Sequence, residues 1–185
     1  MQHRGISIES ITTSAIAIVN ESGIEALTMP KIAKALGVKS QSLYNHVNNL
    51  AQVKTYVSIA LFKALKGRLL EGMLGLTGED AIRKYFEIFY QFSTENANLS
   101  ELLFLPGQED SEELNQAYRG VIQILYTLLA NIISDPDKLQ LYTRMLMSLF
   151  VGFVLNDMNH FFQDKAKQGK AALDDMLSLV IQTIA

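Results

Sequence analysis

Residues 28–47 read TMPKIAKALGVKSQSLYNHV and decide the fold that the sequence predicts. Thr28 can cap a short helix at its amino end, and Pro30 fits the first turn, where its missing N–H group is not needed. Gly37 can adopt the left-handed conformation of a tight turn after this helix, and Val38 can fill the gap between two helices. Two short helices joined by such a turn are typical of a helix-turn-helix, in which the first helix braces the second.

The second short helix is expected over residues 40–47, with Leu43 and Val47 facing inward. Its outer face carries short polar side chains that are not needed in the core, namely Ser40, Gln41, Ser42 and Asn45. Such a helix can enter the major groove of DNA, where Gln or Asn can pair with adenine through two hydrogen bonds. The alternative is a helix face that is merely solvated. Lys31 and Lys34 on the bracing helix can likewise be solubilising charges or part of the DNA-facing surface.

The whole chain predicts an all-α protein. It contains only three prolines, and its β-branched residues are scattered among Leu, Ala, Met, Lys and Gln at helical spacing. Ser7 can cap a first helix that closes at Gly23. Further helices are expected over residues 50–71, 79–96, 111–133, 135–163 and 171–184, with a shorter one over residues 99–105.

Glycines at positions 67, 72, 75 and 78 mark a junction after the first long helix. We therefore expect a helix-turn-helix domain over residues 1–49, a linking helix over residues 50–75 and a larger helical domain over residues 76–185.

Charge is distributed unevenly along the chain. The net charge is −3, but residues 1–70 hold eight basic and three acidic side chains, and the remainder holds eight basic and sixteen acidic ones. A basic first third on an acidic protein indicates a module that faces a polyanion such as double-stranded DNA. The alternative is that charge simply varies along the chain.

Several classes of protein are disfavoured. Cysteine is absent, which excludes disulfides and thiolate chemistry. No amino-terminal segment has the pattern of an export signal, and the longest apolar run, residues 145–155, is too short to span a bilayer. We expect a cytoplasmic protein without a membrane partner.

Five short segments of the motif resemble the amino-terminal DNA-binding domain of tetracycline-repressor (TetR) family regulators: LTM at 27–29, IA at 32–33, LGV at 36–38, SLY at 42–44 and HV at 46–47. The detailed resemblance covers residues 7–60, and the expected nine-helix layout continues it. The resemblance implies a homodimeric transcriptional repressor that binds palindromic DNA. It also implies release by a small-molecule effector held in the carboxy-terminal domain.

Position by position, the resemblance implies base contacts from Ser40, Gln41, Ser42 and Asn45. Tyr44 and His46 would contact the DNA backbone, although each can instead be a packing residue. Thr28, at the amino end of its helix, can offer its hydroxyl group to a phosphate.

Two positions depart from the family pattern. Lys39 stands where the family usually has a capping serine, so either Ser40 caps the helix or the helix start frays. Leu50 stands where the family has a lysine that grips a phosphate, and Lys54, one turn further, is the candidate replacement. Lys39 and Lys54 therefore join the predicted DNA-binding residues.

The carboxy-terminal two-thirds is rich in aromatic and methionine side chains, which fits either a plain core or a ligand cavity. The resemblance favours a cavity, and its apolar walls favour a largely apolar ligand. The polar anchors expected in it are Tyr90, Tyr126 and Asn156. The predicted ligand-binding residues are Phe86, Phe89, Tyr90, Phe104, Ile122, Tyr126, Met147, Phe150 and Asn156.

The last two predicted helices are apolar around much of their circumference, and a surface of that kind usually meets a partner. A symmetric four-helix contact between two copies is the economical arrangement. The alternative is internal burial. The predicted interface residues are Leu146, Leu149, Gly152, Phe153, Leu173, Leu177, Val180 and Ile181.

No pattern indicates catalysis or a cofactor. Asp157 and His160 could share a helical face, but two candidate ligands do not make a metal site. Phosphate-binding loops, hydrolase motifs and kinase motifs are absent, so we expect neither an enzyme nor a metalloprotein. The competing prediction is a helical protein–protein interaction module that does not bind DNA.

Overall fold

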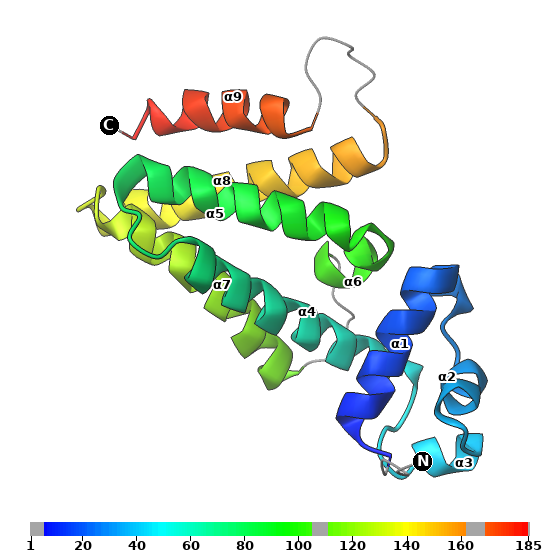
Figure 1. Ribbon diagram of the computed structural model, residues 1–185. Helices are drawn as coiled ribbons and strands as arrows, with labels where there is room; N and C mark the ends of the chain where they lie inside the picture. The colour runs from blue at the N-terminus through cyan, green and yellow to red at the C-terminus, as the bar shows by residue number, and fades with distance from the viewer. Residues whose placement is uncertain (1–5, 105–110, 162–168, 185) are drawn as a thin grey trace. The chain divides into compact units, whose positions relative to one another are not determined.

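The structure, a computed structural model, describes residues 6–104, 111–161 and 169–184 (Figure 1). Within these ranges the chain forms nine α-helices, two short 3-10 helices and no strand, which confirms the all-α prediction. The 3-10 helices span Ile24–Ala26 and Ala97–Leu99. The α-helices are α1 (Ile8–Ser22), α2 (Met29–Leu36), α3 (Ser40–Leu43), α4 (Leu50–Gly72), α5 (Gly78–Glu95), α6 (Ser100–Phe104), α7 (Glu112–Ala130), α8 (Pro136–Met158) and α9 (Lys170–Ile181).

The predicted helix starts are confirmed by their capping bonds. The Ser7 hydroxyl accepts from the Ser10 N–H at 3.1 Å, and the Ser10 hydroxyl accepts from the Ser7 N–H at 3.0 Å, which is a reciprocal capping box for α1. An Asp135 carboxylate oxygen accepts from the N–H groups of Asp137 (2.9 Å) and Lys138 (3.2 Å), which caps α8. These bonds satisfy donors that the first turn of a helix leaves without partners.

The end of α8 differs from the prediction. The helix ends at Met158 instead of continuing to residue 163, and the Asn159 N–H closes it on the Leu155 carbonyl. His160 has a φ of 56°, in the left-handed region that ends a right-handed helix. Asp157 and His160 therefore do not share a helical face. Among the described residues, no group of three or more His, Cys, Asp or Glu could hold a metal ion.

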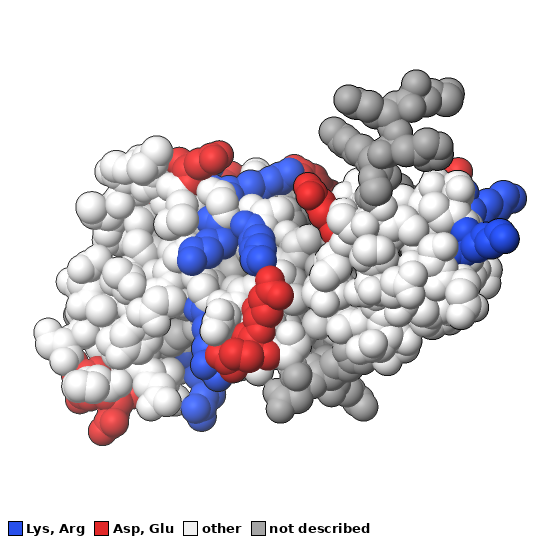
Figure 2. Space-filling view, turned by 90° about the horizontal axis from the view of Figure 1, so that it is seen from below, with Lys and Arg blue, Asp and Glu red and all other residues white. Residues whose placement is uncertain are grey.

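Charged side chains of both signs form small groups on the face shown in Figure 2, separated by broad uncharged areas. The excess of basic residues in the first third of the sequence therefore does not appear on this face as one continuous basic patch.

The chain divides into two compact units. The first unit consists of residues 1–63 and 96–118, and the second unit consists of residues 64–95 and 119–185. Two of the three boundaries fall inside helices, α4 and α7, which contribute residues to both units, and the third falls at the end of α5. The three-part division expected from the sequence follows function rather than compactness, and it stays a prediction.

In the first unit, α1 packs on α2, and α2 packs on α3. The α6 segment joins this unit through polar bonds as well as apolar contacts. The buried Ser58 hydroxyl of α4 donates to the Leu102 carbonyl at 2.7 Å. The Asn98 amide donates to the Asn20 carbonyl of α1 at 3.0 Å.

The second unit has an aromatic core between α5 and α8. The rings of Phe86 and Phe89 lie 5.2 Å and 4.6 Å from the ring of Phe150, measured between centroids. The buried Tyr85 hydroxyl donates to the Val121 carbonyl of α7 at 3.2 Å. Buried polar groups in this core thus have partners, as low-dielectric surroundings demand.

Helix α8 is long and apolar enough to cross a membrane, by length and composition alone. It is longer than the apolar run at residues 145–155, which Ser148 and Gly152 interrupt, because further apolar residues lie among polar ones before that run. Leu146, Phe150 and Val154 of this helix are completely buried. A helix that supplies the core of a folded unit meets the same criterion, so the finding is weak support for a membrane span.

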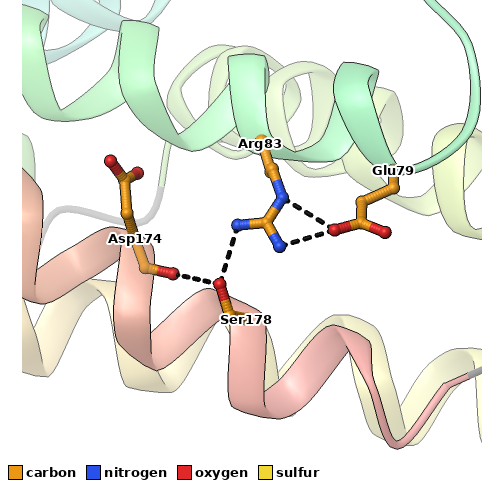
Figure 3. A network of polar contacts seen from close by, with 4 residues as sticks. All are labelled: Glu79, Arg83, Asp174 and Ser178. Atoms are coloured by element: carbon orange, nitrogen blue, oxygen red, sulfur yellow. Dashed lines mark hydrogen bonds and ion pairs between the residues drawn. The ribbon is translucent and has the colours of Figure 1, made fainter.

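Polar contacts attach α9 to α5 in the second unit (Figure 3). The Arg83 guanidinium donates to the Glu79 carboxylate on its own helix and, through Nη1, to the Ser178 hydroxyl of α9 at 3.0 Å. The Ser178 hydroxyl in turn donates to the Asp174 carbonyl at 2.7 Å. One turn further along α5, ion pairs with Lys170 and Lys84 lower the pKa of Glu87.

Candidate DNA interface

The turn between α2 and α3 has the geometry that its sequence predicts. The Thr28 hydroxyl accepts from the Lys31 N–H at 3.3 Å and caps α2. Gly37 has a φ of 68° and a ψ of 30°, which is the left-handed conformation. A residue with a side chain would be strained in this conformation, whereas glycine adopts it readily. Val38, half-buried after the turn, donates its N–H to the Ala33 carbonyl at 3.0 Å. These bonds hold the two short helices at a defined angle.

Helix α3 is shorter than predicted. It spans Ser40–Leu43 rather than residues 40–47. The backbone nevertheless continues as hydrogen-bonded turns, because the N–H groups of His46 and Val47 both donate to the Leu43 carbonyl, at 2.9 Å and 3.0 Å. Leu43 and Val47 are buried, as the spacing predicts, and they anchor this segment to the core of the first unit.

Of the two alternatives for the start of α3, capping by Ser40 is excluded. Lys39 itself occupies the cap position in an extended conformation, with no side-chain capping bond, and Ser40 is the first helical residue. A lysine side chain has no acceptor atom, so it cannot satisfy the N–H groups of the first turn. The first turn of α3 therefore lacks the stabilisation that a capping side chain would give.

The structure brings the predicted DNA-binding residues of α3 and its following turn to one exposed segment. Gln41, Tyr44, Asn45 and His46 are exposed, and Ser40 and Ser42 are half-buried. The Tyr44 side chain is 51% exposed, which argues against a packing role. Thr28 and Lys39 are exposed at the cap positions of the two helices, and Lys54 is half-buried on α4.

The start of α4 carries a capping arrangement that the sequence analysis missed. The Asn49 side chain accepts from the Gln52 N–H at 2.8 Å, and the Gln52 side chain accepts from the Asn48 N–H at 2.7 Å. The Asn-x-x-Gln spacing is a form of the capping-box signal and could have been recognised. Leu50 is half-buried at the first position of α4, so it offers no charge to a phosphate.

The electrostatics of this region favour a polyanion. No acidic residue occurs between Glu25 and Glu71 in the sequence. Within the part of the chain that the structure describes, Lys31, Lys34 and Lys39 take part in no ion pair. Their charges are therefore available to attract phosphate groups, and binding of that kind weakens as salt rises.

The predicted ligand-binding residues have different environments in the structure. Phe86, Phe89 and Phe150 pack against one another in the buried core of the second unit. Phe104 belongs to the first unit. The remaining members of the set are the buried Met147 and the half-buried Ile122, Tyr126, Tyr90 and Asn156. Their role in ligand binding stays a prediction.

Two of the proposed polar anchors already have partners. The Tyr90 hydroxyl donates to the Asp157 carboxylate at 2.9 Å, and burial, together with this bond, raises the pKa of Tyr90 to about 12. The Asn156 amide donates to the Gly152 carbonyl at 2.6 Å on its own helix. A ligand that used either group would have to replace an existing hydrogen bond.

The predicted dimer residues separate into two groups. Leu146, Leu173 and Leu177 are completely buried in the chain's own core, and Phe153 and Ile181 are also buried. These five side chains therefore do not line an exposed surface of the chain. The half-buried members of the prediction are Leu149, Gly152 and Val180.

A short helix braced by a second one across a left-handed glycine turn, with polar side chains exposed on its outer side, defines a helix-turn-helix DNA-binding protein. Residues 11–48 match the family described as bacterial regulatory proteins, tetR family. The amino-terminal part of the chain thus resembles the DNA-binding domain of this family, and the protein is a DNA-binding transcriptional regulator.

Known proteins resemble this chain both over the motif and over its full length. A helix-turn-helix transcriptional regulator of Mycobacterium tuberculosis is 26% identical over 160 residues, which cover 86% of this chain and 73% of the relative. The class D tetracycline repressor of Escherichia coli is 44% identical over 41 residues, covering 22% of this chain and 19% of that protein.

Among solved structures, the regulator FadR of Bacillus subtilis in complex with stearoyl-CoA has a TM-score of 0.70. It is 18% identical to this chain, and the match covers 96% of this chain and 99% of FadR. This likeness shows the fold over the full length of both chains. The relative and this structural neighbour are both named as regulators of transcription.

Proposed function

We propose that this regulator is a homodimeric repressor that binds a palindromic operator in double-stranded DNA. Each copy places the α3 segment in one major groove, and a small, largely apolar ligand releases the complex. As a protein that acts on DNA, it works in the cytoplasm. The competing role as a protein–protein interaction module is not favoured, because the relatives are DNA-binding regulators.

The observation that carries this proposal is the exposure of Gln41, Tyr44 and Asn45 on a segment anchored by Leu43 and Val47. An anchored backbone holds the side chains in one register, which base recognition requires. Amide and hydroxyl side chains supply the donors and acceptors that read base edges. Within the DNA-binding set, Thr28 and the exposed cationic Lys39 are suited to phosphates, and half-buried Lys54 stays the candidate replacement for the lysine absent at position 50.

The apolar outer sides of α8 and α9 support a dimer. Leu141 and Met145 of α8 are 62% and 38% exposed, and Leu179 of α9 is 69% exposed. Together with the half-buried Gly152 and Val180, they offer apolar surface that the chain itself does not cover. A Cβ atom at Gly152 would meet no other atom within 4 Å, so a partner helix could approach closely there.

Release by a ligand requires that the ligand bind one arrangement of the dimer more tightly than the other. Two recognition helices must be about 34–36 Å apart to enter successive major grooves. A ligand in the apolar second unit, acting through α4, would change this separation. The structure of FadR with stearoyl-CoA supports ligand control in a protein of the same fold.

Selection of the preferred duplex from a random pool tests the central claim. We expect a sequence with two-fold symmetry, bound with an affinity that falls as salt rises, by about 0.9 log units per log unit of salt for each neutralised phosphate. Binding that selects no sequence and ignores salt would support the interaction-module role instead.

Replacement of Gln41 tests base reading. Gln41→Ala is expected to cost about 1–3 kcal/mol on the selected operator and to relax preference at one base pair, because a bidentate contact is lost. The matched control is Gln91→Ala, an exposed glutamine of α5 in the second unit, which should leave operator affinity unchanged. Equal losses on operator and random DNA for Gln41→Ala would assign this residue to the DNA backbone.

A further inference from the structure

An apolar groove of about 510 Å³ lies in the second unit, between the carboxyl end of α4 and α7. Its aliphatic lining comes from Leu70, Met73, Leu74, Leu76, Ile124 and Leu128. Leu70 is 52% exposed and Leu74 is 81% exposed, so the groove opens to solvent. The volume falls within the range of small-ligand sites, about 300–1,000 Å³.

One positive charge lies at the groove. Lys66 is the only charged residue among those that line it, and no acidic residue does so. Within the described ranges Lys66 takes part in no ion pair, in contrast to Lys63 one turn earlier, which pairs with Glu113 at 2.8 Å. An unpaired cation beside an apolar surface is available to a ligand.

Gly120 of α7 makes room for the Lys66 side chain. A Cβ atom at position 120 would lie 3.3 Å from both Cδ and Nζ of Lys66, which is tighter than ordinary contact. The ammonium group therefore lies close to the α7 backbone at the groove, while the Lys66 residue as a whole is exposed. Lys66 and Leu70 lie about one turn apart on α4, and Met73 and Leu74 follow directly after its last residue, Gly72, so the charge precedes the apolar side chains along the chain.

We propose that this groove binds an amphiphile with one anionic head group and an unbranched aliphatic tail. The head group pairs with Lys66, and the tail lies along Leu70 and Leu74. Two features of the lining select this occupant. The single cation matches one anion, and the absence of aromatic rings among the lining residues favours a flexible chain over a flat aromatic ligand.

The length of the groove suggests the probe. The six steps from Lys66 to Gly72 rise about 9 Å along α4, and Leu74 lies beyond the end of the helix, so a medium-length chain spans this lining. We therefore choose decanoate as the anionic probe. Decyltrimethylammonium, which has a tail of similar length and the opposite charge, is the comparison probe. Binding to the full chain is measured by calorimetry below the micelle concentration of each probe, without DNA. The outcome is thus independent of the proposed role in repression.

Decanoate is expected to bind more tightly than decyltrimethylammonium. Lys66→Gln should lower the affinity for decanoate by about fivefold, which is the upper end for the loss of an exposed ion pair. The affinity for decyltrimethylammonium should stay unchanged or rise. Leu74→Asn should weaken both probes, because it removes apolar contact shared by both tails. The control Lys63→Gln removes one positive charge from the same helix outside the groove and should change neither affinity.

Each variant is checked for an unchanged circular dichroism spectrum and melting temperature before its affinity is compared. Equal binding of the two probes, or an effect of Lys63→Gln as large as that of Lys66→Gln, would overturn the proposal. Retained decanoate binding in Leu74→Asn would overturn it as well, because the tail would then lie elsewhere.

Discussion

The helix-turn-helix and the helices of the second unit use apolar residues in different ways. In α2 and α3 the large apolar side chains lie on one side. Met29, Ile32 and Leu43 are buried, and the exposed positions include Lys34 and Gln41. In α8 apolar residues lie all around the helix. Phe150 is completely buried, whereas Leu141 on the same helix is 62% exposed.

This difference separates two kinds of information. In the helix-turn-helix, caps and a turn within a few residues of one another set the backbone, and exposure follows from the pattern. In α8 and α9, an apolar residue can equally serve the core, a partner or a ligand, and only the neighbouring helices decide which. Three substitutions, from the largest expected effect to the smallest, test this contrast.

Phe150→Ala tests the core of the second unit. We expect a loss of about 3–5 kcal/mol of unfolding free energy, because the ring contacts both Phe86 and Phe89 and its removal leaves a cavity. Phe161→Ala, at a side chain that is 72% exposed, should change stability by no more than about 0.5 kcal/mol. Urea denaturation compares the two. Similar losses in both variants would show that burial does not distinguish these apolar positions.

Gly37→Ala tests the turn of the helix-turn-helix. The added Cβ meets no atom within 4 Å, so the expected cost of about 1–2 kcal/mol comes from the positive φ alone. Gly67→Ala in the interior of α4 also meets no atom within 4 Å, and it should stabilise by about 0.5–1 kcal/mol. Thermal unfolding measures both. If the two variants shift the melting temperature in the same direction, the left-handed turn does not govern stability there.

Tyr90→Phe tests the polar link between α5 and α8. We expect a loss of about 1 kcal/mol at pH 7, because the hydrogen bond to Asp157 is removed. Burial, and then the Asp157 carboxylate, raise the pKa of Tyr90 from 10.0 to about 12, so the neutral phenol is favoured in the folded state. This contribution is complete below pH 10 and is lost as the pH rises through about 12.

The matching control is Tyr44→Phe, at an exposed tyrosine. The free energy of unfolding is measured by denaturation at several values between pH 9 and pH 12. It should fall with rising pH in the wild type and in Tyr44→Phe, and it should fall less in Tyr90→Phe. An equal fall in all three proteins would place the titrating group elsewhere.

Several features were readable from local sequence. The caps at Ser7, Thr28 and Asp135 were predicted because each side chain acts on N–H groups two or three residues away. The cap at Asn49 was equally local and was missed. The early end of α8 was not predictable from periodicity, because the apolar pattern continues past the helix into Phe161.

The sequence alone determined the all-helical backbone, the braced pair of short helices and the exposed polar row that marks a DNA-binding regulator, because caps, turns and amphipathic spacing act over a few residues. Tertiary structure decided which of the many apolar residues of α5, α8 and α9 fill the core. It also brought Lys66 and Gly120, far apart in the sequence, to one groove. Burial depends on contacts between distant segments, and packing between helices settles those contacts.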